Sequence, residues 1–483
     1  MTLNLNPKST DSKYVHQTDW LGLNSIYYNR LNRKVSFNIQ DVIDYDNFEI
    51  DEIGLTNYLN YGYSAFGRTP IKNVRFTLPN SILKQDTNNI TESQKADEFD
   101  LEKIHESRPS EIIDLIELWI NNYVKEQKTR SAEINPWLGV IPLSGGLDSR
   151  LIAYFLQKYD NVQAFSYGVT WNQEKSNEVK IARHIAKELG IPWSHIFLES
   201  IHKFLDANVS QFGISTHAHS MYHDAFYSEI EKQTQMWTNK TVFSGIYGDV
   251  WAGNHRFSNI NKPEDLRKLS LSHGVDGSNM RIKELQIYHP TSDEIEFWEI
   301  NHKKLKNEKF RTLTMARLKM QLISHLVKIP KNYGFDAVSP FLDKEIILGM
   351  LNLSEFNRND RKWLKDFFSK EGLIGKNKWI FLGRGNSLEF NAIKQWPLAE
   401  LNLTNLEWLL EKKDIKIINQ VIKFKSWYRL VVFLDENFIS SKLLKNLRLK
   451  NRFFQQAYNH YMLLFPLQEA VKLSNIHKFH ERD

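Results

Sequence analysis

The sequence predicts an α/β fold, because short apolar stretches typical of buried strands alternate with stretches of helical periodicity. The apolar stretch 138–143 is followed at once by a glycine-rich turn and by the helix-like stretch 148–158. A second strand is expected at 164–168, before residues 177–190, where apolar side chains recur at three- and four-residue spacing ahead of a glycine. A third strand is expected at 242–244, and apolar side chains at helical spacing predict further helices at 110–127, after Pro109, and at 310–327. Such alternation is typical of a parallel sheet covered by helices.

The turn at 144–149 has the composition of a phosphate-binding loop and reads Ser-Gly-Gly-Leu-Asp-Ser. Its glycines allow a tight turn in which backbone N–H groups point at one spot, and the helix start adds roughly half a positive charge there. Its serines can donate hydrogen bonds to phosphate oxygens. The residues expected to hold phosphate are Ser144, Gly145, Gly146, Asp148 and Ser149.

The carboxylate of Asp148 implies a metal ion, since it would repel a bare phosphate unless a cation bridges the two groups. Magnesium is the expected cation. The spacing fits neither a Walker loop nor the three-glycine dinucleotide pattern. The alternative is a plain tight turn in which small residues serve only packing, but its polar groups would then be buried without purpose.

Six ordered motifs, including the loop at 144–149, resemble those of the PP-loop ATP pyrophosphatases, and within them the synthetase domain of asparagine synthetase-like amide-forming ligases. Besides the loop, they are Ala-Phe-Ser-Tyr-Gly at 164–168, the helix 177–190 with Glu178 where the family has an acid, Ser-Gly-Ile-Tyr-Gly-Asp at 244–249, Pro-Phe-Leu-Asp at 340–343, and Lys-Trp-Ile-Phe at 378–381. The resemblance covers about residues 101–390. It implies an adenine nucleotide alpha hydrolase-like parallel sheet with flanking helices.

The resemblance also implies cofactors and site residues. ATP would lie with its adenine on the backbone of the strand at 164–168, and Asp148 and Asp249 would face Mg2+. Lys378 would supply a positive charge to the departing pyrophosphate, its alternative being a surface lysine in a lysine-rich loop. Lys365 is a weaker candidate, near a position where the family has arginine. Further nucleotide contacts are expected at Ser166, Gly168 and Gly245.

Two departures from the family pattern bear on the chemistry. Ile246 stands where glutamine-dependent asparagine synthetases carry a glutamate, so the acid or base that manages protons on the amine is not evident. Tyr247 is the candidate for this role, although its register differs by one from the tyrosine of the β-lactam-forming relatives. The sequence Asp-Ala-Val at 336–338 replaces Glu-Ala-Arg, so we expect a different substrate.

Residues 1–84 resemble the rear strands and the last helix of the Ntn-type glutaminase sandwich that precedes this domain in glutamine-dependent relatives. The chain contains no cysteine, so the glutaminase nucleophile is missing. We therefore expect a truncated, inactive β domain, the alternative being an unrelated small β domain. Residues 85–108 are polar and are expected to form a linker, 109–400 the synthetase domain, and 401–483 a mostly helical C-terminal extension.

Composition and patterning limit the cellular setting. The 483 residues include 63 basic and 57 acidic side chains, and a net charge of +6 over this length does not indicate a nucleic-acid-binding protein. Residues 1–17 lack an apolar signal core, and no run reaches the 18 apolar residues that a membrane span needs. A cytoplasmic protein without a membrane span is expected.

A histidine cluster is formed by His217, His219 and His223. The last two would share a face of a helix, which is metal-like spacing, but no carboxylate motif with metal-ligand spacing accompanies them. Core or pocket histidines are the favoured interpretation, with substrate contact as their function.

Together these features predict an ATP-dependent ligase that adenylates a small-molecule carboxylate and transfers the acyl group to ammonia or an amine. Surface polysaccharide or natural-product biosynthesis is the expected setting, with a separate glutaminase as one source of nitrogen. The alternatives are a peptide or β-lactam cyclase of the same family, and a non-catalytic binding scaffold on a decayed ligase fold.

Overall fold

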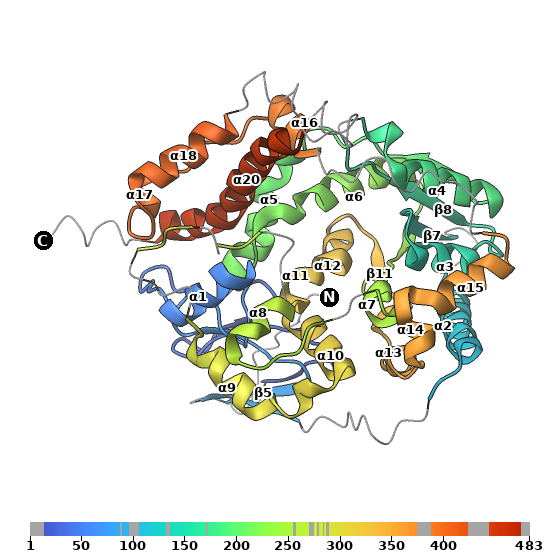
Figure 1. Ribbon diagram of the computed structural model, residues 1–483, viewed down its shortest axis with the longest axis horizontal. Helices are drawn as coiled ribbons and strands as arrows, with labels where there is room; N and C mark the ends of the chain where they lie inside the picture. The colour runs from blue at the N-terminus through green and yellow to red at the C-terminus, as the bar shows by residue number, and fades with distance from the viewer. Residues whose placement is uncertain are drawn as a thin grey trace, which may run out of the picture.

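The computed structural model describes most of the chain in three parts: an N-terminal β unit, a central α/β domain and a group of C-terminal helices (Figure 1). Side chains are not described for 444–453. The described residues are 14–86, 89–95, 106–131, 136–170, 172–254, 257–269, 275–277, 280–283, 285, 289–373, 388–423 and 444–474.

The predicted α/β fold is confirmed, since five strands of the described chain form a parallel sheet in the order β11-β10-β7-β8-β9. The first strand along the chain is central, the next two extend the sheet on one side, and the last two extend it on the other. The strand order therefore reverses between β7 and β10, where ligands bind in open α/β sheets. The strands are β7 (Trp137–Pro142), β8 (Val162–Ser166), β9 (Trp193–His195), β10 (Asn239–Phe243) and β11 (Asp336–Val338).

Strand β7 is buried on both faces, which explains its continuous apolar sequence. Trp137 and Ile141 belong to the core beneath one face, whereas Leu138 and Val140 belong to the core on the other. The helices that supply the first core include α2 (Pro109–Arg130), α3 (Leu147–Leu156), α4 (Asn177–Glu188), α7 (Gly248–Ala252), α10 (Glu308–Leu318), α13 (Lys344–Leu351) and α15 (Lys362–Lys370). The second core includes residues of α6 (Met221–Thr234) and α12 (His325–Asn332).

The helix expected after Pro109 is confirmed as α2, whose start the sequence specifies. Pro109 occupies the first helical turn, where its missing N–H costs nothing. The Glu111 side chain accepts from the Arg108 backbone N–H at 2.9 Å, which completes a capping box.

The helical stretch expected at 310–327 is broken into α10, α11 (Met320–Ile323) and α12. The breaks fall at Lys319 and Ser324, where ψ is −5° and −18°, so the backbone leaves ideal helical geometry. The apolar periodicity was correct, but these changes of direction are set by packing.

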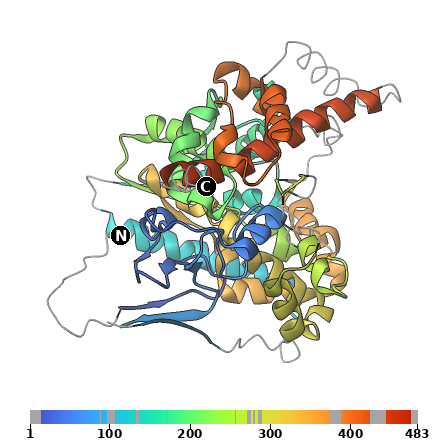
Figure 2. The ribbon, with the colours of Figure 1, turned by 90° about the vertical axis from the view of Figure 1, so that its left-hand side faces the viewer.

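The N-terminal unit contains, within the described residues, two three-stranded antiparallel sheets, β3-β2-β4 and β1-β5-β6 (Figure 2). Tyr28 of the first sheet and Leu83 of the second share a small buried core. The elements are β1 (Tyr14–Gln17), β2 (Tyr27–Asn29), β3 (Val35–Ser36), α1 (Glu52–Tyr61), β4 (Val74–Phe76), β5 (Ser81–Gln85) and β6 (Ile90–Gln94).

The predicted linker at 85–108 is wrong in its first part, because β6 pairs with β5 and completes the second sheet. Glu92 on β6 accepts hydrogen bonds from the Tyr28 hydroxyl at 3.0 Å, the Leu78 N–H at 2.6 Å and the Ser81 hydroxyl at 2.7 Å. A polar strand can be integral to a sheet when its carboxylate is satisfied in this way. The N-terminal unit therefore extends to about residue 95.

The C-terminal helices share a core with the N-terminal unit. Leu55 and Leu59 of α1 belong to the same buried cluster as Tyr461 and Leu464 of the last helix. The Tyr58 hydroxyl donates to the Leu463 carbonyl at 2.8 Å, which joins the two parts directly. The remaining helices are α5 (Leu205–Phe212), α8 (Leu266–Leu269), α9 (Ser292–Asn301), α14 (Glu355–Arg358), α16 (Leu388–Gln395), α17 (Leu403–Leu406), α18 (Lys412–Ile422) and α20 (Leu444–Leu473).

Across the residues that can be described, none of the helices combines the length with the apolar character required to cross a membrane.

The packing of α1 gives a direct test of this arrangement. A Cβ at Gly54 would lie 1.9 Å from the Thr69 carbonyl oxygen, which is backbone and cannot move aside cheaply. We expect Gly54→Ala to lower the free energy of unfolding by about 1–3 kcal/mol through overpacking, measured by urea denaturation. Glu52→Ala, an exposed change in the same helix, is the control and should leave the midpoint unchanged. Equal midpoints for both variants would contradict the close contact.

Candidate active site

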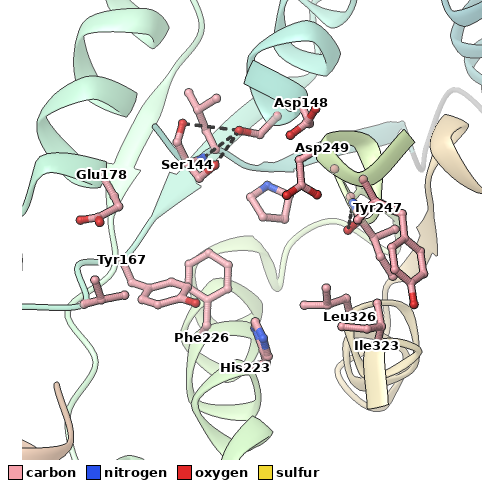
Figure 3. Close-up of a pocket in the computed structure, with 18 of the residues that line it drawn as sticks. Ser144, Asp148, Tyr167, Glu178, His223, Phe226, Tyr247, Asp249, Ile323 and Leu326 are labelled. Atoms are coloured by element: carbon pink, nitrogen blue, oxygen red, sulfur yellow. Dashed lines mark hydrogen bonds between the residues drawn. The ribbon is translucent and has the colours of Figure 1, made fainter. Parts of the chain in front are cut away.

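A cavity of about 450 Å3 opens at the carboxyl ends of β7, β8 and β10, at the point where the strand order reverses (Figure 3). The acidic side chains Asp148 and Asp249 lie together on one side, and Glu178 and Tyr167 lie on another. Seven of the residues predicted to act in catalysis or nucleotide binding line it: Ser144, Asp148, Ser149, Ser166, Gly245, Tyr247 and Asp249. The tertiary structure thus collects residues from three separate strand ends.

The loop after β7 closes on itself through its two serines. The Ser144 and Ser149 hydroxyl oxygens are 2.9 Å apart, and the Ser149 hydroxyl also accepts from the Ser144 N–H at 3.1 Å. The Ser144 hydroxyl accepts from the Gly146 N–H at 3.1 Å. These bonds hold the loop in a fixed shape, and both hydroxyls lie at the cavity where an anion would meet them.

Three predicted glycines do not line the cavity. A Cβ at Gly145 would meet the Ile181 side chain at 3.2 Å, and a Cβ at Gly168 would lie 2.1 Å from the Gln173 carbonyl oxygen. At Gly146 the nearest atom would be the Ser144 hydroxyl, at 3.2 Å. Close packing thus accounts for Gly145 and Gly168, and nucleotide contact at all three glycines stays a prediction.

Asp148 is held in an unfavourable position for a carboxylate. Its Oδ1 atom is buried and has no hydrogen-bond partner within the described part of the chain. Burial and, second, the charge of Asp249 raise the pKa of Asp148 to about 7, while Arg361 opposes this rise. The Arg361 guanidinium lies 3.6 Å from the Asp148 carboxylate, in a residue of left-handed backbone with φ 56°.

This pair of acids suits a divalent cation. Two carboxylates from neighbouring strand ends, one of them with a buried oxygen that lacks a partner, match the oxygen ligands that Mg2+ prefers. No group of three or more histidine and acidic side chains in the described chain has metal-binding geometry. Asp148 and Asp249 are therefore the residues that would hold Mg2+, with waters and phosphate oxygens completing its shell.

Gly248 was missed by the sequence analysis and makes the close approach of the acids feasible. A Cβ there would lie 2.8 Å from the Asp148 Cβ, Cγ and Oδ1 atoms. Any side chain at Gly248 would thus displace the Asp148 carboxylate. The available signal was a glycine directly before Asp249.

The Pro-Phe-Leu-Asp motif supports the helix that carries Asp249. The Trp251 indole N–H, on α7, donates to the Phe341 carbonyl at 2.9 Å. Asp343 is the N-cap of α13, where its Oδ1 atom accepts from the Glu345 N–H at 2.9 Å. The role of this motif in the structure is thus to anchor α7 and start α13.

The structure argues against the predicted acid–base role of Tyr247. Its hydroxyl donates to the Ala316 carbonyl at 2.8 Å and lies in the protein interior. Burial raises the pKa of Tyr247 well above its ordinary value. Because this hydroxyl is engaged with a backbone carbonyl in the interior, it is not positioned to exchange a proton with a bound amine.

Lys319 is a site residue that the sequence analysis missed. It lines the cavity from the break between α10 and α11, and only 9% of the residue is exposed. Burial lowers the pKa of Lys319 to about 8, while the charge of Asp249 works against this decrease. The available signal was a lysine between two apolar residues, Leu318 and Met320, of a helical stretch.

The predicted hydroxyl contact from Ser166 is occupied within the fold. The Ser166 hydroxyl donates to the Leu143 carbonyl and accepts from the Trp193 indole N–H at 2.9 Å. These bonds join the loop region to β9. A nucleotide contact from Ser166 stays a prediction.

The family acid Glu178 does lie at the cavity, with its Oε2 atom buried and without a partner in the described residues. His223 lines the cavity too, and burial lowers its pKa to about 3, so its ring is neutral. His219 lies instead beside Glu389 at 3.2 Å, and the ring of His217 is 6.1 Å from that of His219. The described chain thus places the three histidines in different surroundings and forms no metal site from them.

Of the two predicted lysines, Lys365 lies within the described residues and Lys378 lies outside them. Lys378, with the motif at 378–381, lies outside the described residues, so its role stays a prediction. Lys365 forms an ion pair with Asp360 and is 41% exposed. The positive group that reaches Asp148 is Arg361, which precedes Lys365 by about one helical turn.

The comparisons with known proteins agree with this geometry. Residues 139–370, within the central α/β domain, match the asparagine synthase family model. This domain supports an ATP-using carbon–nitrogen ligase in general. No curated protein matches the chain.

Two solved structures resemble the chain at low identity. An NH3-dependent NAD synthetase from Campylobacter jejuni subsp. jejuni NCTC 11168, in complex with the nitrate ion, is 16% identical, with a TM-score of 0.25 over 45% of this chain and 96% of that one. A glutamine-dependent NAD+ synthetase from Acinetobacter baumannii, in complex with ADP, is 14% identical, with a TM-score of 0.23 over 55% of this chain and 52% of that one.

The raised pKa of Asp148 predicts a pH-dependent stability. Between about pH 4 and pH 7 the folded chain keeps the proton that the unfolded chain releases, so the free energy of unfolding should fall as pH rises through this window. Asp148→Asn should flatten this dependence and raise the melting temperature at pH 8, measured by calorimetry in the presence of EDTA. A profile identical to that of the wild type would contradict the buried, proton-holding state.

Proposed function

We propose that the protein is an ATP-dependent ligase that activates a substrate carboxylate by adenylation and transfers the acyl group to ammonia or an amine. The observation that carries this proposal is the pair Asp148 and Asp249, with a buried oxygen on Asp148, beside a serine and glycine loop at the point where the strand order reverses. Both the family match and the cavity position support it.

The proposed reaction has two steps, adenylation and acyl transfer. A carboxylate oxygen attacks the α phosphorus of ATP, the bond to the β-phosphate oxygen breaks, and pyrophosphate leaves an acyl adenylate. The amine nitrogen then attacks the acyl carbon, AMP leaves, and one proton is released. Bound magnesium would neutralise charge on the leaving pyrophosphate.

The proposed role of each residue follows from its position at the cavity. Ser144 and Ser149 would bind phosphate oxygens at the helix start, and Asp148 and Asp249 would hold the cation. The partnerless oxygen of Asp148 argues against a decayed binding scaffold, because a buried carboxylate without a ligand only destabilises the fold.

Lys319 is placed to bind the substrate carboxylate. It is a buried positive group at the cavity wall. Charge-assisted hydrogen bonds to a carboxylate are stronger in such a water-poor environment. Lys378 remains the proposed cation for the leaving group, as the family motif implies.

Exchange of labelled pyrophosphate into ATP, dependent on the carboxylate, tests the first step. We expect Asp148→Asn to reduce this exchange at least ~100-fold, since the cation loses a charged ligand. Asp366→Asn, an exposed carboxyl change on α15 where Asp366 pairs with Lys362, is the control and should exchange like the wild type. Full exchange in Asp148→Asn would exclude the proposed cation-holding role.

Kinetics of a lysine pair test the carboxylate site. Lys319→Met should raise KM for the carboxylate ~10-fold or more and leave KM for ATP within about twofold, because only the carboxylate loses its charged partner. Lys328→Met is the control: the pKa of Lys328 is also lowered to about 8 by burial, but this lysine lies outside the cavity lining. If KM for the carboxylate rises equally in both variants, Lys319 does not bind the carboxylate.

A further inference from the structure

A second, smaller chamber of about 50 Å3 adjoins the active-site cavity. Tyr167 and Val169 line both spaces, so they form the wall between them. Three tyrosines line the smaller chamber, and its other lining residues are mostly apolar. The lining residues are Tyr167, Val169, Ile201, His219, Met221, Tyr222, Leu388, Glu389 and Tyr458.

The chamber contains a buried carboxylate that is only half satisfied. Glu389 is 2% exposed, and its Oε1 atom lies 3.2 Å from the His219 Nε2 atom. Its Oε2 atom is buried and has no hydrogen-bond partner in the described chain. A lone carboxylate oxygen in a water-poor chamber is costly unless a positive or hydrogen-donating group joins it.

Aromatic residues line the chamber together with Glu389. The ring of His219 lies 5.8 Å from the ring of Tyr222 and 5.8 Å from that of Tyr458, in edge-on contacts. The ring of Tyr167 lies 5.9 Å from that of Tyr222. Tyrosine faces attract compact cations electrostatically, and a cage of rings with one carboxylate is a cation-binding arrangement.

The size and donor set restrict the cation. The chamber holds no more than a few atoms of the size of a water molecule. It lacks the six or more oxygen ligands that divalent metals take. An ammonium ion instead carries four N–H donors, which can serve the carboxylate oxygen and tyrosine hydroxyls while its charge faces the rings.

We propose that Glu389, with Tyr167, Tyr222 and Tyr458, forms a binding site for an ammonium ion beside the active-site cavity. The part of this inference that makes the ion the source of the amine rests on the proposed function. The acceptor nitrogen is then ammonia, formed when the bound ion releases one proton to solvent, because a larger amine does not fit the chamber. Tyr167 separates the bound ion from the cavity that would hold the acyl adenylate.

Binding is tested without ATP or carboxylate, by thermal unfolding of the full chain in NH4Cl, KCl and NaCl at equal ionic strength. Ammonium should raise the melting temperature of the wild type by roughly 2 °C or more relative to sodium, since a ligand that binds only the folded state stabilises it. Glu389→Gln keeps the side-chain shape and should show no such difference. In sodium it should melt no lower than the wild type, because it removes a buried charge.

The matched control is Asp224→Asn, another buried carboxyl change, on the helix that carries Tyr222. Asp224 lies outside the chamber lining and is hydrogen-bonded to Asn208 at 3.0 Å and Tyr333 at 3.2 Å. This variant should keep the ammonium response. If Asp224→Asn also abolished the ammonium response, the assignment of the site to Glu389 would be overturned.

The catalytic assay tests the role of the site. Glu389→Gln should raise KM for ammonium ~10-fold, with KM for ATP and the turnover number at saturating ammonium within about twofold. If potassium stabilised the wild type as much as ammonium did, and Glu389→Gln left KM for ammonium unchanged, the chamber would be a structural cation site. That result would overturn the proposal. Ammonium binding in a chain that forms no amide would overturn the proposed function and leave the chamber assignment standing.

Discussion

The structure depends on two carboxylates kept together at the ends of neighbouring parallel strands. Asp148 and Asp249 repel each other and are poorly solvated, as the raised pKa of Asp148 shows. Packing imposes this arrangement: Gly248 leaves the necessary space, and the bond from Trp251 to Phe341 fixes the helix of Asp249. Part of the folding free energy is thus stored as electrostatic strain, which a bound cation would relieve.

The two regions outside the sheet pack against each other, and the C-terminal one reaches the small chamber. The N-terminal unit and the C-terminal helices share one buried core, joined by the bond from Tyr58 to Leu463. Tyr458, on the same last helix, then closes the small chamber beside the cavity. The C-terminal extension expected from the sequence therefore packs as an integral part of the fold. It supplies a wall of a proposed binding site.

Predictions that rested on a motif at a strand end gave the correct position, whereas the prediction that depended on the direction of one side chain was wrong. The loop serines, Asp148 and Asp249 were located correctly at the cavity, because backbone geometry at strand ends fixes where such motifs lie. Tyr247 was misassigned because its hydroxyl direction depends on a left-handed backbone, with φ 63°, that turns the ring toward Ala316. Sequence order carries no information on such a rotation.

The sequence by itself determined the α/β class, three of the sheet strands, the helices at 109–130 and 177–188, and the position of the glycine and serine loop. These features are local, since apolar periodicity and glycine at a turn act over a few residues. Tertiary structure alone decided that Lys319 and Glu389 are buried beside cavities, because the elements around them come from distant parts of the chain. It also made β6 a strand, since Glu92 finds its hydrogen-bond donors only in the folded unit.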